Sequence, residues 1–85
     1  MVKLFCPWGA ATWLLSELDP EDPDICFGLC DLGFGCPEVG SVRLSELAAV
    51  RGPAGLTIER DRHFKPAKSL TAYAAEAADK GRVLA

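Results

Sequence analysis

Three apolar segments between Ala11 and Leu44 constrain the fold more than any other feature of the sequence. They run from Thr12 to Leu18, from Ile25 to Leu32 and from Glu38 to Leu44, and an acidic turn with two prolines and a Gly/Pro turn separate them. β-branched, aromatic and aliphatic residues favour strands, whereas proline and acidic residues interrupt them. This stretch therefore predicts a three-stranded antiparallel meander.

The middle segment is predicted to be the central strand of the meander. Its side chains alternate between two faces, and both faces are largely apolar, as in a strand that is covered on both sides. Gly28 leaves space for a neighbouring backbone or for a large side chain such as Trp13. We expect Trp13 and Phe27 to be buried aromatic residues of the core.

Two helices are predicted after the meander. The first, from Ser45 to Arg51, begins with a capping residue and ends before Gly52. The second, Leu70 to Lys80, follows Ser69 as a cap and has apolar residues at a spacing of three and four before Gly81 ends it. The second helix is expected to cover one face of the sheet.

The predicted fold class is α+β, a small antiparallel β-sheet meander with two short to medium helices packed on one face. We expect a single domain over residues 1–85, because a chain of 85 residues supports one modest core. Lys3 to Cys6 adds a short edge strand. No apolar run approaches the twenty residues that span a bilayer, and no secretory signal is recognisable, so a cytoplasmic location without membrane contact is expected.

The four cysteines leave three interpretations open. They are Cys6, Cys26, Cys30 and Cys36. A disulfide framework requires an oxidising compartment. A zinc site requires two clusters of paired ligands two to four residues apart, whereas the intervals here are twenty, four and six, with His63 far downstream. Buried free thiols are the interpretation that we prefer, with no metal and no other cofactor.

Charge is distributed unevenly along the chain. Seven carboxylates and one lysine give the segment from Met1 to Val42 a net charge of −6, whereas eight basic and five acidic residues give the rest +3. A concentrated negative patch attracts a basic surface, although an acidic turn that only improves solubility is the alternative. The candidate partner-binding residues are Glu17, Asp19, Glu21, Asp22, Asp24 and Asp31.

No catalytic residues are predicted, and we expect a protein that is not an enzyme. A turn flanked by prolines does not supply the desolvated, positioned carboxyl group that acid–base catalysis requires. The pair Gly33 and Gly35 lacks the third glycine and the following helix of a phosphate-binding loop. Basic residues of the C-terminal half favour an alternative, a nucleic-acid-binding accessory protein of a plasmid: Arg51, Arg60, Arg62, Lys65 and Lys68. A purely structural or interaction module is a further alternative.

Four segments give the chain a resemblance to a known family. They are Leu44-Ser45-Glu46-Leu47, Arg51-Gly52-Pro53-x-Gly55-Leu56, Ile58-Glu59-Arg60-Asp61 and Phe64-Lys65-Pro66. With them the stretch from Thr12 to Ala78 resembles a bacterial domain family of unknown function that is common on conjugative plasmids and other mobile elements. The resemblance implies a fold and a genetic setting but no activity. In size and acidity, and by class only, the chain also resembles the small phage proteins that block CRISPR defence.

The functional hypothesis from the sequence is a non-enzymatic acidic binding protein of a phage or mobile element. Its acidic surface would occupy the DNA-binding site of a host defence complex and so inhibit that complex. The expected partner is a protein with a basic surface, such as a subunit of a CRISPR effector. Direct binding of nucleic acid is not part of this hypothesis.

Overall fold

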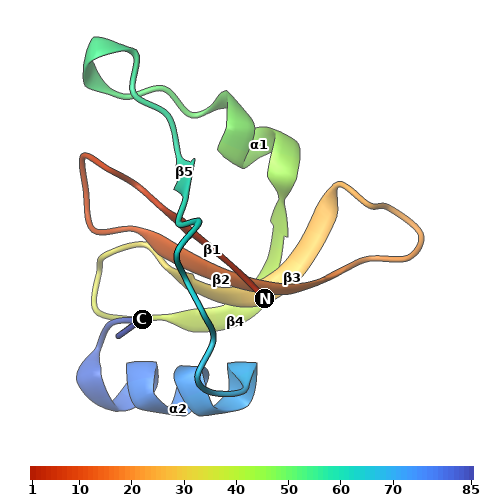
Figure 1. The fold of residues 1–85 in the computed structure, drawn as a ribbon, viewed down its shortest axis with the longest axis vertical. Coiled ribbons are helices and arrows are strands. Elements are labelled where there is room, and N and C mark those ends of the chain that lie inside the picture. Colours follow the sequence, from red (N-terminus) through yellow and green to blue (C-terminus); the bar gives the residue numbers. More distant parts are fainter.

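In the computed structural model, which describes residues 1–85, one antiparallel sheet lies between two helices (Figure 1). Its strands follow the order β4-β3-β2-β1-β5, and the α+β class predicted from the sequence is confirmed. The elements are β1 (Val2–Phe5), β2 (Thr12–Leu18), β3 (Ile25–Asp31), β4 (Glu38–Arg43), α1 (Leu44–Ala49), the 3-10 turn η1 (Pro53–Gly55), β5 (Glu59–Arg60) and α2 (Leu70–Lys80). None of the helices has the length and apolar character needed to cross a bilayer.

The predicted meander is present as β2, β3 and β4, and β3 is the middle one of these three strands. Gly28 of β3 lies opposite Leu15 of β2, and a Cβ atom at Gly28 would be 2.1 Å from the carbonyl oxygen of Leu14. The space that this glycine leaves is therefore filled by the neighbouring backbone and not by Trp13. The predicted edge strand at Lys3 to Cys6 is β1, but it is not at the edge, because β5 pairs with its outer side.

The two helices lie on opposite faces of the sheet, so the prediction that both pack on one face is wrong (Figure 1). Leu14 points toward α2, whereas its neighbours Trp13 and Leu15 point toward α1. The physical reason is the alternation along β2 and β3, which places apolar side chains on both faces, so that each face must be covered.

Each face has its own apolar core. On the α2 face, Leu14 and Leu29 pack with Tyr73 and Ala77 of the helix. On the α1 face the buried side chains are those of Trp13, Leu15 and Cys26, and partly buried neighbours, among them Leu44 and Leu47 of α1, surround them. Helix α1 contributes no fully buried residue. The α2 face is therefore closed by a helix, and the α1 face is covered by partly buried side chains.

Phe27 is not buried as predicted, whereas the two cysteines of β3 lie in the core of the α1 face. Phe27 is 39 % exposed and belongs to neither core, so its prediction as a buried aromatic is wrong, whereas Trp13 is buried as expected. Cys26 is buried, and Cys30 is half-buried beside it in the core of the α1 face. Burial raises the pKa of the Cys30 thiol, and the nearby Cys26 adds to the shift.

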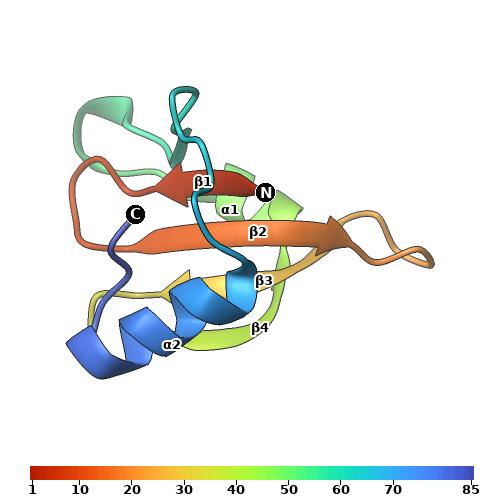
Figure 2. The ribbon, with the colours of Figure 1, turned by 60° about the horizontal axis from the view of Figure 1, so that its bottom comes forward.

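The segment after α1 carries the chain from one face of the sheet to the other. Ile58 packs in the core of the α1 face. Phe64 packs in the core of the α2 face, with the centroid of its ring 6.2 Å from the centroid of the Tyr73 ring. Between them β5 pairs with β1, so the chain passes around this edge of the sheet (Figure 2). The segments Ile58-Glu59-Arg60-Asp61 and Phe64-Lys65-Pro66, which carry part of the family resemblance, therefore have a structural role in this fold.

Candidate functional site

The acidic turn, Asp19 to Asp24, connects β2 to β3 and projects beyond the body of the molecule (Figure 2). It extends past the end of β2, on the opposite side of the molecule from the turn between β3 and β4 (Figure 1). A projecting turn can enter a concave surface of a partner that a flat face of the sheet would not reach.

Two carboxylates of the acidic turn determine its backbone conformation. Oδ1 of Asp19 accepts hydrogen bonds from the backbone N–H groups of Glu21 at 2.8 Å and Asp22 at 3.4 Å. Oδ1 of Asp22 accepts one from the N–H of Asp24 at 3.1 Å. Aspartate side chains stabilise turns in this way because the carboxylate satisfies backbone donors that no strand partner can reach. Asp19 and Asp22 are thus structural residues as well as surface charges.

Asp24 joins the acidic turn to the start of α1. Its Oδ1 accepts a hydrogen bond from the N–H of Ser45 at 2.9 Å, and its Oδ2 accepts one from the Ser45 hydroxyl at 2.7 Å. The bond from the hydroxyl is the main cause that lowers the pKa of Asp24. Ser45 is therefore not the cap predicted for this helix, because Asp24 provides the carboxylate that satisfies the first turn.

Arg43 lies between two carboxylates of the acidic turn. Its Nη1 is 3.2 Å from Oδ2 of Asp22 and 3.4 Å from Oδ2 of Asp24. These contacts, those with Asp22 first, raise the pKa of the Arg43 guanidinium. Part of the negative charge that the sequence concentrates in the acidic turn is therefore balanced within the molecule.

Among the six predicted binding residues, Glu17 and Glu21 are exposed and their side chains make no hydrogen bond or ion pair within the protein. Glu17 lies at the end of β2, and Glu21 lies within the acidic turn. Because neither carboxylate stabilises the fold, both are available to a partner. Of the six predicted binding residues, these two are the ones that the structure leaves free.

Asp31 does not join the other predicted residues. It lies at the opposite end of β3 from the acidic turn and is only 3 % exposed. Its Oδ1 accepts a hydrogen bond from the N–H of Gly33 at 2.8 Å, and its Oδ2 accepts one from the N–H of Val83 at 3.0 Å. Asp31 therefore fixes the C-terminal segment to the sheet.

A groove beside the acidic turn was not predicted from the sequence. The register between β2 and β3 shifts between Leu15 and Glu17, so that Ser16 is an extra residue in β2. Beyond this bulge Leu18 lies opposite Cys26 and on the α1 face, where it is 55 % exposed. Simple alternation would place Glu17 on that face, and nothing in the sequence indicates the bulge.

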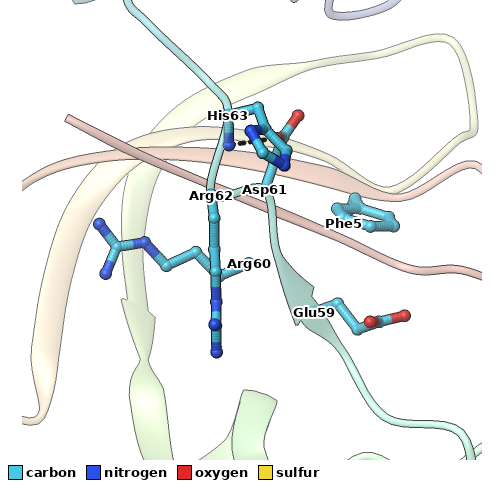
Figure 3. A pocket seen from close by; sticks show the side chains of 6 residues that line it. All are labelled: Phe5, Glu59, Arg60, Asp61, Arg62 and His63. Carbon is cyan, nitrogen blue, oxygen red and sulfur yellow. Dashed lines mark hydrogen bonds between the residues drawn. The ribbon is translucent and has the colours of Figure 1, made fainter.

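A second hollow lies beside β5 and the three residues that follow it (Figure 3). It has a volume of about 610 Å³ and is lined by Phe5, Glu59, Arg60, Asp61, Arg62 and His63. The guanidinium groups of Arg60 and Arg62 extend in different directions, so they do not converge on one anion (Figure 3). Asp61 pairs with Lys3 at 3.7 Å and accepts a hydrogen bond from the backbone N–H of His63 at 2.9 Å. A general base is usually oriented by a carboxylate that accepts a hydrogen bond from its imidazole. The hydrogen bond between Asp61 and His63 comes from the backbone N–H and not from the imidazole ring.

Other basic residues of the C-terminal half also have partners. Arg51 donates through Nη1 to the carbonyl oxygens of Ala48 at 2.6 Å and Val50 at 3.0 Å, and so satisfies the end of α1. Lys68 pairs with Glu76. The ion pair with Glu76 balances the charge of Lys68, whereas the bonds to carbonyl oxygens hold the Arg51 guanidinium at the end of α1.

Comparison with known proteins gives the chain a family. The protein-family model described as "Protein of unknown function (DUF2958)" matches residues 1–84. The chain belongs to this family. The match confirms the predicted membership in a family of unknown function, and it extends beyond the stretch from Thr12 to Ala78 that carried the resemblance. No curated protein and no solved structure matched the chain.

Proposed function

We propose that this DUF2958 protein is a non-enzymatic binding protein that presents its acidic turn to a basic surface of a partner protein. The observation that carries the proposal is the shape of the turn, which projects from the body and has its conformation fixed by hydrogen bonds of Asp19, Asp22 and Asp24 (Figure 2). A fixed turn loses little conformational freedom on binding, which favours affinity.

The chemistry of the turn indicates which class of partner it suits. Glu17 and Glu21 add free carboxylates to a turn whose other carboxylates are already held in place. Basic surfaces that attract carboxylates are common where proteins bind the phosphates of nucleic acid. We therefore propose a nucleic-acid-binding protein as the partner and competition with DNA as the effect. A host defence complex such as a CRISPR effector, opposed by a phage or mobile element, is the specific case that we propose.

The test uses the two free carboxylates, because replacing Asp19, Asp22 or Asp24 would also disturb the fold. The double variant Glu17→Gln and Glu21→Gln removes two charges near the turn. The matched control, Glu46→Gln and Glu59→Gln, removes two exposed charges on α1 and β5 that also make no side-chain hydrogen bond. Circular dichroism should show that both variants are folded.

Immobilised parent and variant proteins would be exposed to a lysate of a bacterium that carries the gene, with and without added duplex DNA. We expect capture of a DNA-binding protein, loss of capture when DNA is added, and weaker capture by the Glu17/Glu21 variant than by the control. The effect should decrease at high salt, since the Debye length is about 8 Å at physiological ionic strength. Equal capture by both variants would contradict the proposal, and direct, salt-sensitive binding of DNA by the protein itself would favour the plasmid accessory protein instead.

A further inference from the structure

An apolar groove lies directly beside the acidic turn, on the α1 face. It has a volume of about 300 Å³, which is enough for one or two apolar side chains. Seven of its nine lining residues are hydrophobic, and they come from the N-terminal residue, β1, β2, β3 and the start of α1: Met1, Val2, Leu4, Leu15, Leu18, Cys26 and Leu44. The groove lies at the same end of the sheet as the turn, because Leu18 at the end of β2 and Cys26 near the start of β3 both line it.

Leu18 links the groove to the acidic turn. It lines the groove, is 55 % exposed, and is followed in sequence by Asp19, the first residue of the turn. The bulge at Ser16 gives Leu18 this position, and bulges often redirect a side chain at a binding site. The leucine is too exposed to contribute much to the core, so its apolar surface is available to a partner.

The charge around the groove is negative. Ser16 and Glu17 are the two polar residues among the nine that line it, and the acidic turn begins directly after Leu18. Arg43, the basic residue next to Leu44, is already paired with Asp22 and Asp24 and so offers little positive charge to a ligand. An apolar side chain flanked by lysine or arginine is complementary to this arrangement.

A second copy of the chain is a poorer match for the groove. Two copies related by a two-fold axis through this surface would use the same patch on both sides. Their two acidic turns would then lie close together and repel each other. The charges therefore favour a partner of opposite sign.

We infer that the groove receives an apolar side chain of the partner, while basic residues beside that side chain contact Glu17 and the acidic turn. This inference rests on the proposed function and adds to it the chemistry of the partner's contact segment: leucine or phenylalanine next to lysine or arginine. The groove would supply short-range affinity, and the turn would supply long-range attraction.

The probe is a short lysine-rich peptide with a central Leu-Phe pair, compared with the same peptide carrying Ser-Ser at that place. Fluorescence anisotropy should show that the Leu-Phe peptide binds the protein about tenfold more tightly, as expected for burial of a large apolar side chain. The variant Leu18→Ser should lose this preference. Leu32→Ser is the matched control, because Leu32 is 57 % exposed but lies at the opposite end of β3, and it should keep the preference.

The outcomes separate the groove from the turn. Equal binding of the two peptides, or no effect of Leu18→Ser, overturns the inference that the groove receives an apolar side chain. If the Glu17/Glu21 variant still binds both peptides more weakly than the parent does, the proposed function of the acidic turn stands. Peptide binding that is insensitive to the Glu17/Glu21 variant counts against the turn as well. Absence of binding by either peptide overturns the inference. A dimer in sedimentation experiments that Leu18→Ser dissociates would assign the groove to a second copy and overturn it too.

Discussion

The two faces of the sheet are covered by helices of very different kinds. On the α2 face an eleven-residue helix has its own cap, since Ser69 accepts a hydrogen bond from the N–H of Ala72 at 3.1 Å, and it ends at Gly81 in a left-handed conformation. On the α1 face a six-residue helix has no fully buried residue and takes the carboxylate for its first turn from Asp24. The face with the weaker cover is the one with the open groove.

This difference shows how a small domain can combine a stable core with a binding surface. A chain of 85 residues buries few side chains, so it cannot cover both faces equally well. Helix α2 buries Leu14 and Leu29 almost completely and so stabilises the fold from one side. The incomplete cover by α1 leaves Leu18 exposed beside the acidic turn.

The largest expected effect comes from removing the central side chain of the α1 face. Trp13→Ala should lower the free energy of unfolding by about 3 to 5 kcal/mol, because it truncates a large aromatic residue that is 5 % exposed. Phe27→Ala, at an exposed aromatic residue of the other face, should lower it by roughly 1 kcal/mol. Urea denaturation measures both. If the two variants lost similar amounts of unfolding free energy, Trp13 would contribute no more to stability than the exposed Phe27, and the account of the α1-face core would be wrong.

An intermediate effect is expected at the glycine that lets β2 approach β3. Gly28→Ala should lower stability by about 1 to 3 kcal/mol, because its Cβ would be 2.1 Å from the backbone oxygen of Leu14, which cannot move like a flexible side chain. Gly40 lies opposite Gly28 on β4, and no atom is within 4 Å of a Cβ built there. Gly40→Ala should therefore stay within about 1 kcal/mol of the parent. Equal thermal unfolding of the two variants would contradict this account.

The smallest effect is expected at the contact that replaces a cap on α1. The pKa of Asp24 is below its ordinary value of 3.8 because Ser45 donates to the carboxylate. The contribution of Asp24 to stability is therefore present above that value and is lost as the pH falls through the lower pKa of the folded state. Asp24→Asn should be less stable than the parent at pH 7, and the difference should decrease in the acid range.

Ser45→Ala is the control for this pH dependence, since it removes the donor and keeps the carboxylate. It should give a difference of the same sign that also decreases below pH 3.8. Denaturant titrations at several pH values measure both variants. A difference that is constant from neutral to acid pH would show that the bond to Ser45 does not stabilise the ionised form.

Local signals explain why much of the fold could be predicted from the sequence. The predicted bounds of β2 and α2 match the structure, because the prolines after Leu18 and the pair Ser69 and Gly81 are signals within a few residues of the element ends. The placement of the helices could not be predicted in the same way. With apolar residues on both faces of β2 and β3, alternation does not indicate which face a helix covers.

The candidate site was predicted less completely, for a related reason. The acidic turn is local in sequence, and so its carboxylates were identified correctly as a cluster. Whether a carboxylate is free depends on distant residues: Arg43 and Ser45 engage Asp24, and Val83 engages Asp31. The exposure of Leu18 depends on a bulge whose register is set by the pairing with β3.

The buried carboxylate of Asp31 has a consequence for the way the protein is made. During synthesis, β3 leaves the ribosome long before Val83, whose N–H satisfies Oδ2 of Asp31 across 52 positions of sequence. Until then the meander contains a carboxylate that folding would bury without one of its donors, and burying such a charge is unfavourable. The sheet therefore gains this donor for Asp31 only when the C-terminal segment docks against β3, so loss of the residues from Val83 onward should lower its stability.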